Sequence, residues 1–81
     1  MSPQQRLSSK APQKLSNIIY DLRNKSGVTQ EVLARAVGVT RQTIIAIEKG
    51  GYIPSVLLAI KLAQFFRQPV EKVFIYHEHE K

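Results

Sequence analysis

Cysteine is absent from the 81 residues of this chain. Its absence excludes disulfide bonds and thiolate metal sites, and it agrees with a cytosolic protein. The sequence also has no apolar run near 18 residues, so no membrane span is expected. The first 14 residues, MSPQQRLSSKAPQK, lack the apolar segment of a secretory signal. We therefore expect a cytoplasmic protein made of one small domain.

Residue types that perform acid–base or nucleophilic chemistry are scarce as well. Asp21 is the single aspartate, and both histidines, His77 and His79, stand in the last five residues. There is no phosphate-binding glycine loop and no arrangement of paired acids. Two imidazoles are too few ligands for a closed zinc site. The sequence predicts a protein that is not an enzyme and that uses no metal, cofactor or small-molecule ligand.

Positive charge is in clear excess. Twelve Lys and Arg stand against six Asp and Glu, for a net charge of +6, which predicts affinity for a polyanion, most simply nucleic acid. Residues 1–14 hold Arg6, Lys10 and Lys14 without an acid and with few apolar residues, so we interpret them as a flexible basic arm. Such an arm either lies along DNA or is a solvated tail that aids solubility.

The apolar spacing of residues 15–75 predicts helices. Leu15, Ile18, Ile19 and Leu22 recur at helical spacing and define a first helix, which Gly27 ends as a C-cap glycine does. The next two helices are each expected to begin after a capping threonine and to end at a glycine. These boundary residues are Thr29 with Gly38 and Thr40 with Gly50.

Two further helices and a short tail follow. Ser55 is placed to cap a fourth helix, VLLAIKLAQFF at 56–66, whose apolar residues run nearly all round and predict the central helix of the fold. Pro69 opens a short fifth helix, VEKVF at 70–74. Residues 76–81 form a tail in which a short strand is possible. The prediction is an all-α, compact five-helix bundle.

The third helix has two apolar sides when its residues are laid at about 100° per residue. Ile44 and Ile47 fall on one side and are expected to serve the core. The opposite side holds Gln42, Ile45, Ala46 and Lys49, with Arg41 at its edge. An isoleucine on that outward side is either tolerated surface or a contact to a partner.

Two helices joined by a short glycine-containing turn are typical of a helix-turn-helix. The stretch GVTQEVLARAVGVTRQTIIAIEKGGYIPS at 27–55 resembles the Cro/repressor-type (XRE-like) helix-turn-helix family of bacterial, archaeal and phage regulators. The resemblance extends over residues 15–75 without gaps. It rests on LR at 22–23, GVTQ at 27–30, LA at 33–34, GVTRQTI at 38–44, IEKG at 47–50 and PS at 54–55.

The resemblance implies a lambda-repressor-like bundle that binds double-stranded DNA with its third helix in the major groove. On this basis Arg41, Gln42, Ile45 and Ala46 are expected to contact bases, although Arg41 and Gln42 could instead hold phosphates. The expected contacts to the DNA backbone are Gln30, Thr40, Lys49 and Tyr52. For Gln30 the alternative is a solvated surface glutamine.

The same resemblance implies a partly buried ion pair between Arg23 and Glu48, and an unusual Arg67 where relatives carry glycine. It also implies a homodimeric repressor on a roughly palindromic operator. The residues expected at the dimer surface are Phe66, Val73, Phe74 and Ile75. The segment FIYHEH at 74–79 is either a strand that pairs with its twin or a frayed tail.

An alternative function is a protein-interaction module of the antitoxin type that also represses its own operon.

Overall fold

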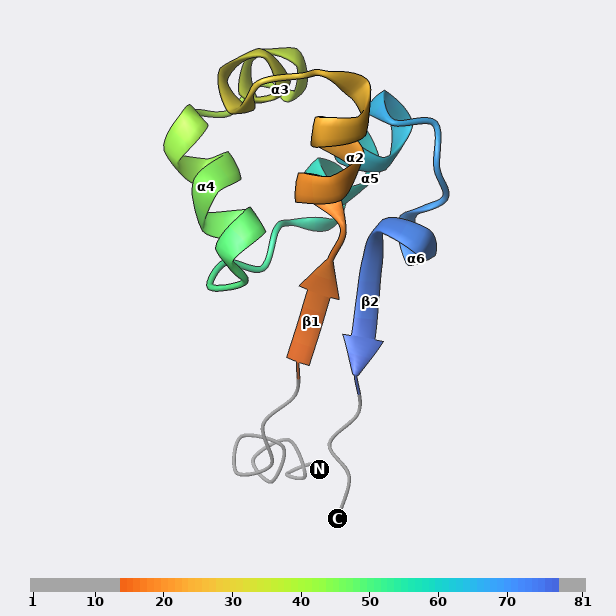
Figure 1. Ribbon diagram of the computed structural model, residues 1–81. Helices are drawn as coiled ribbons and strands as arrows, with labels where there is room; N and C mark the ends of the chain where they lie inside the picture. The colour runs from red at the N-terminus through yellow and green to blue at the C-terminus, as the bar shows by residue number, and fades with distance from the viewer. Residues whose placement is uncertain (1–13, 78–81) are drawn as a thin grey trace.

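The computed structural model describes residues 14–77, which form five helices and one two-stranded sheet (Figure 1). The helices are α2 (Ile19–Ser26), α3 (Gln30–Val37), α4 (Arg41–Lys49), α5 (Val56–Phe65) and α6 (Val70–Val73), and the strands are β1 (Lys14–Asn17) and β2 (Phe74–His77). The five expected helices are confirmed. Arg6 and Lys10 of the basic arm, and His79 of the tail, lie outside the described residues. None of the described helices is long and apolar enough to cross a membrane.

The helix boundaries follow local chemistry, as the sequence predicts. The hydroxyls of Thr29, Thr40 and Ser55 accept hydrogen bonds from backbone N–H groups in the first turns of α3, α4 and α5. Each cap satisfies one donor that the helix itself leaves free. Helices α2, α3 and α4 each end at a glycine in the left-handed conformation, with φ of 69°, 80° and 87°. A left-handed C-cap is the position where the missing Cβ of glycine is an advantage.

The first helix begins later than its apolar spacing predicts. Leu15 belongs to β1 rather than to α2, which starts at Ile19. The side chain of Asn17 explains this start, because its Oδ1 accepts a hydrogen bond from the backbone N–H of Ile19 at 3.1 Å. The extension of the first helix back to Leu15 was therefore wrong, because the side chain of Asn17 binds the backbone just before the helix, inside a stripe of helical spacing.

The C-terminal strand that the sequence allowed is present, but it pairs with β1 of the same chain instead of with a twin. Strand β2 runs antiparallel to β1, with Leu15 opposite Tyr76 and Ser16 opposite Ile75. Next to the sheet, the N–H of Ile18 donates to the carbonyl oxygen of Val73 at 3.1 Å. Figure 1 shows the two strands side by side below the helices, so the two ends of the described chain meet there.

The core lies between the helices and draws on every one of them. Its fully buried large side chains are Ile19, Leu33, Ile44, Ile47, Leu62 and Val73. Helix α5 contributes Leu58, Leu62 and Ala63 to this core, but its other side faces solvent, with Val56 and Leu57 exposed. The expectation that α5 is central and covered all round is therefore right for one side only.

Candidate nucleic-acid interface

Helices α3 and α4 form a helix-turn-helix. The turn between them is Gly38, Val39 and Thr40, where the backbone N–H of Val39 donates to the carbonyl oxygen of Ala34 at 2.9 Å. Ala34 is itself buried, and its small side chain lets the two helices approach closely. The hydroxyl of Thr40 then caps α4 by accepting from the N–H of Thr43 at 3.3 Å. These local contacts fix the direction in which α4 leaves the turn.

Helix α4 separates its residues onto two sides, as the wheel predicts. Ile44 and Ile47 are completely buried, which confirms them as the core pair. Arg41, Gln42 and Lys49 are exposed, and Ile45 and Ala46 are half-buried. Ile45 has Arg41 one helical turn before it and Lys49 one turn after it, and side chains at that spacing are neighbours. The outward side of α4 therefore combines hydrogen-bond donors and acceptors with an apolar centre.

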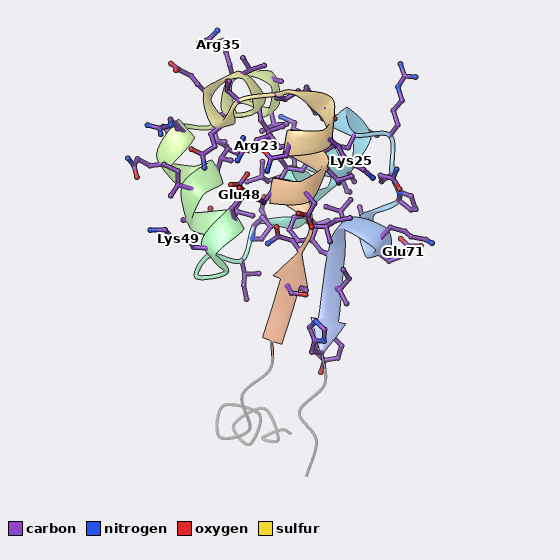
Figure 2. All side chains as sticks on the ribbon, in the orientation of Figure 1. Arg23, Lys25, Arg35, Glu48, Lys49 and Glu71 are labelled. Carbon is purple, nitrogen blue, oxygen red and sulfur yellow. The ribbon has the colours of Figure 1, made fainter. Side chains whose placement is uncertain are left out.

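A hydrogen-bonded network around Glu48 holds α4 to the rest of the domain. The carboxylate accepts from Nε of Arg23 at 2.7 Å and from its Nη2 at 3.2 Å. Both side chains are largely buried, with 11% of Arg23 and 7% of Glu48 exposed. The Nη1 group of Arg23 also donates to the carbonyl oxygen of Val28 at 3.1 Å. Figure 2 shows Arg23 and Glu48 pointing toward one another between α2 and α4.

The pKa of Arg23 is raised above its ordinary value, first because its guanidinium donates hydrogen bonds to Glu48. Burial acts in the opposite direction, and the negative charge of Glu48 adds to the rise. The guanidinium therefore stays charged at every pH at which the fold would be studied. A two-point hydrogen bond between a planar guanidinium and a carboxylate fixes both side chains in orientation as well as in distance.

Gln30 belongs to this network. Its amide Nε2 donates to Oε1 of Glu48 at 3.1 Å, and the residue is half-buried. The side chain therefore has a structural contact that the sequence did not predict. Its backbone still lies in the first turn of α3, where free N–H groups and the helix dipole favour an anion. A hollow beside the N-terminus of α3 is lined by Gln30 and also by Arg41, the first residue of α4.

The other expected DNA-contacting residues lie around the ends of α4. Lys49 is in its last turn and points away from the body of the molecule (Figure 2). Thr40 is exposed at the start of the helix. Tyr52 follows the helix in the turn before α5 and is also exposed. These residues are thus exposed at the two ends of α4.

The residues expected at a dimer surface are mostly used inside the chain. Val73 is completely buried and Phe74 is nearly so, because both belong to the core. Phe66 and Ile75 are half-buried, and Phe66 packs at the margin of the core. A contact surface for a second copy would therefore have to be built from other residues than Val73 and Phe74.

Asn17 is a positioning residue that sequence reasoning missed. Its Oδ1 accepts from the N–H of Ile19, and its Nδ2 donates to the carbonyl oxygen of Ile47 at 3.0 Å, near the C-terminal end of α4. One amide thus joins β1, α2 and α4. The available signal was the tendency of an asparagine side chain to bind the backbone N–H two residues further on. The local sequence does not predict the bond from Asn17 to Ile47, because the two residues are 30 positions apart.

The described part of the tail does not assemble a metal site. Within residues 14–77 no three histidine or acidic side chains lie together as metal ligands would. His77 instead forms a hydrogen bond of 2.8 Å between its Nε2 and the hydroxyl of Ser16 across the sheet. This bond belongs to the pairing of β1 with β2.

Comparison with known proteins identifies the family. A family model described as "Helix-turn-helix" matches residues 19–73. An uncharacterized HTH-type transcriptional regulator of Methanocaldococcus jannaschii is 50% identical over 66 residues, which cover 82% of this chain and all of the relative. Another from Bacillus subtilis is 48% identical over 64 residues, covering 79% of this chain and 97% of the relative. The chain therefore belongs to the helix-turn-helix family of transcriptional regulators.

Two characterised proteins are similar at a lower level. The transcriptional repressor RstR of the cryptic phage CTXphi in Vibrio cholerae is 36% identical over 58 residues, which cover 72% of this chain and 52% of the repressor. The crystal structure of the restriction-modification controller protein C.AhdI from Aeromonas hydrophila superposes with a TM-score of 0.62 at 28% identity. The superposition covers 67% of this chain and 82% of that one.

Proposed function

We propose that the protein is a transcriptional repressor that binds double-stranded DNA sequence-specifically, as a homodimer, with α4 in the major groove. The observation that carries this proposal is the division of α4. Its inner side is anchored by Ile44, Ile47 and the Glu48 network, while Gln42 and Arg41 project freely. An anchored helix with exposed polar side chains on its outer side matches the needs of base readout, because a major groove admits one α-helix. The similarity to the repressor of Vibrio cholerae supports repression in place of activation.

In this proposal the residues of α4 have separate roles. Arg41 and Gln42 supply hydrogen bonds to base edges, since arginine pairs with guanine and glutamine with adenine. Ile45 and Ala46 lie between them and Lys49 and give apolar contact to a thymine methyl group. Lys49, Thr40 and Tyr52 hold the DNA backbone. Gln30 contributes through its backbone N–H in the first turn of α3, while its side chain stays on Glu48.

The decisive experiment is selection of bound sequences from random duplex DNA, followed by binding measurements with variants. We expect Gln42→Ala to weaken binding to the selected sequence by about 10- to 100-fold, the range of one good base contact. Its binding to random duplexes should be unchanged. Gln64→Ala is the matched control, because Gln64 is an exposed glutamine on α5. Equal losses of Gln42→Ala on selected and random duplexes would show that Gln42 does not read a base.

Ile45 offers a second, independent measurement. Repeating the selection with Ile45→Ser should remove the preference for thymine at one position of each half-site, because the apolar contact to its methyl group is lost. The preferences at neighbouring positions should persist, since Arg41 and Gln42 are untouched. An identical selected sequence at every position would mean that Ile45 is only a surface residue.

A further inference from the structure

Tyr20 is an aromatic residue on α2 that the proposed DNA contacts do not use. It is 57% exposed, yet the centre of its ring lies 5.4 Å from Cζ of Arg23. The two residues are three positions apart on one helix, so their side chains are neighbours. A guanidinium within about 6 Å of the centre of an aromatic ring is attracted by the negative charge of the ring face, which is a cation–π contact.

The ring contact is made in addition to the hydrogen bonds of Arg23. Its Nε and Nη2 donate to Glu48 and its Nη1 donates to the carbonyl oxygen of Val28, so all three nitrogen atoms of the guanidinium are engaged. A ring attracts the group through its charge and takes up no N–H donor. Tyr20 therefore adds to the attachment of Arg23 without taking a donor away from Glu48.

Tyr20 also stands on the solvent side of the ion pair. Arg23 and Glu48 are largely buried, whereas more than half of Tyr20 is exposed. Because the exposed ring contacts the buried cation, it separates part of the pair from water. An ion pair is stronger where less water screens it. Loss of the ring would thus remove one attraction and weaken a second.

We propose that Tyr20 is a positioning residue for α4. Its ring holds the guanidinium of Arg23 in the orientation that binds Glu48, and Glu48 in turn fixes the outward side of α4. This inference rests on the proposed function, because the orientation of α4 matters for DNA only if α4 reads bases. Tyr20 itself contacts neither a base nor a phosphate in this assignment.

Two simpler roles of Tyr20 make different demands on its side chain. A residue that only covers apolar surface would be replaced well by leucine, which has no ring. A hydroxyl that binds a DNA phosphate would be lost in both Tyr20→Phe and Tyr20→Leu. The proposed contact needs the ring and not the hydroxyl, so only Tyr20→Leu should disturb it. Tyr76→Leu is the matched control, because Tyr76 is 55% exposed and lies on β2, outside the network.

The first measurement uses the full chain without DNA. The Nε–H of Arg23 is bonded to Glu48 and largely buried, so it exchanges its proton with water when the pair opens. We expect Tyr20→Leu to speed this exchange, followed by NMR, by about threefold to thirtyfold, the range of a cation–π contact from exposed to desolvated. Tyr20→Phe and Tyr76→Leu should leave the rate unchanged. An unchanged rate in Tyr20→Leu overturns the proposal.

Removing the cation separates the ring contact from apolar cover. In the double variant Arg23→Met, Glu48→Leu no guanidinium remains, so adding Tyr20→Leu should not change the equilibrium constant of unfolding in urea. In the natural chain the same substitution should raise that constant by about threefold to thirtyfold. Equal effects in the two backgrounds would show that the ring only covers apolar surface, and the proposal would be wrong.

The step from Arg23 to α4 is tested on DNA. Tyr20→Leu should weaken binding to the selected duplex by about threefold or more and leave binding to random duplexes unchanged, because a loosened α4 spends less time in the orientation that fits the bases. Tyr20→Phe should bind as the natural chain does. Equal weakening by both variants would assign the hydroxyl to a phosphate instead. Unchanged binding of Tyr20→Leu to the selected duplex would show that α4 does not depend on Tyr20, and either result refutes the positioning role.

The failure of this proposal can be told apart from the failure of the proposed function. A natural chain that selects no sequence would refute base reading by α4, while proton exchange at Arg23 would still report the ring contact. If the natural chain selects a sequence and Tyr20→Leu binds it equally well, only the role of Tyr20 is refuted.

Discussion

At the scale of single residues, Glu48 joins α4 to two other helices. Its carboxylate accepts hydrogen bonds from Arg23 on α2 and from Gln30 on α3. Among the described residues, every buried polar side-chain atom has a hydrogen-bond partner. Charged groups are costly to bury, so the value of such a pair lies in orientation more than in net stability. The network sets the angle of the helix that we propose enters DNA.

We expect Arg23→Ala and Glu48→Ala each to lower the free energy of unfolding by about 3–5 kcal/mol, because each leaves a buried charge without its partner. The double variant Arg23→Met, Glu48→Leu should lose less than either single variant, since it leaves no charge behind. Urea unfolding followed by circular dichroism measures all three. Single losses that simply add in the double variant would show that the two residues do not act as a pair.

The pH dependence of this pair has a definite sign. A basic group whose pKa is raised by folding contributes stability below its unfolded pKa and loses it only when pH exceeds that value. The contribution of Arg23 is therefore fully present across neutral and mildly alkaline pH.

Arg67 is the one described residue other than glycine with a positive φ, at 57°. It stands in the turn between α5 and α6, where the family resemblance implies glycine. A side chain in the left-handed conformation costs about 1 kcal/mol or more. We expect Arg67→Gly to raise the free energy of unfolding by about 1 kcal/mol, as measured by urea unfolding. Gln68→Gly is the control and should give no gain, because Gln68 has no positive φ to relieve.

At the scale of elements, the helices were predictable because their signals are local. The capping residues Thr29, Thr40 and Ser55 and the glycines at helix ends determine boundaries within a few residues of themselves. The pairing of β1 with β2 joins residues about 60 positions apart, as the bond between Ser16 and His77 shows. No local pattern reports such a partner, and Leu15 could continue a helical stripe equally well.

In the candidate site, too, the features set by local sequence were predictable and those set by contacts between helices were not. The core and outward sides of α4 follow from its spacing, so Ile44 and Ile47 were foreseen. The hydrogen bond from Gln30 to Glu48 was not foreseen, because it depends on how α3 approaches α4 in space. The exposed side of α5 was also missed, since an apolar residue does not reveal whether its own chain or another molecule covers it.

Asn17 gives a prediction at the scale of elements, because it joins a strand to two helices. Asn17→Ala removes the hydrogen bond to the N–H of Ile19 and the bond to the Ile47 carbonyl oxygen. We expect a loss of about 1–2 kcal/mol in the free energy of unfolding, because two part-buried hydrogen bonds are lost. Asn24→Ala is the control, an exposed residue within α2 where alanine favours the helix. Thermal unfolding distinguishes them, and equal melting temperatures for both variants would refute the joining role.

At the scale of the whole molecule, the net charge of +6 governs binding to any duplex. Each phosphate neutralised by a lysine or arginine releases counterions, so affinity falls as salt rises. We expect Lys49→Gln to weaken binding to selected and random duplexes alike and to reduce the slope of log K against log salt by about 1 per subunit. Lys72→Gln, an exposed lysine on α6, should leave the slope unchanged. An effect of Lys49→Gln confined to the selected sequence would assign it to a base instead.

The pairing of β1 with β2 has a consequence for how this chain can be rearranged. Lys14 lies opposite His77 in the sheet, so the first and last described residues are neighbours in space. A short linker that joins His77 to Lys14 would allow new chain ends to be made in the exposed turn at Gly51, between α4 and α5. Such a circular permutant would keep every helix and both strands intact. The proximity of the two described ends therefore makes a different order of the same elements along the chain feasible.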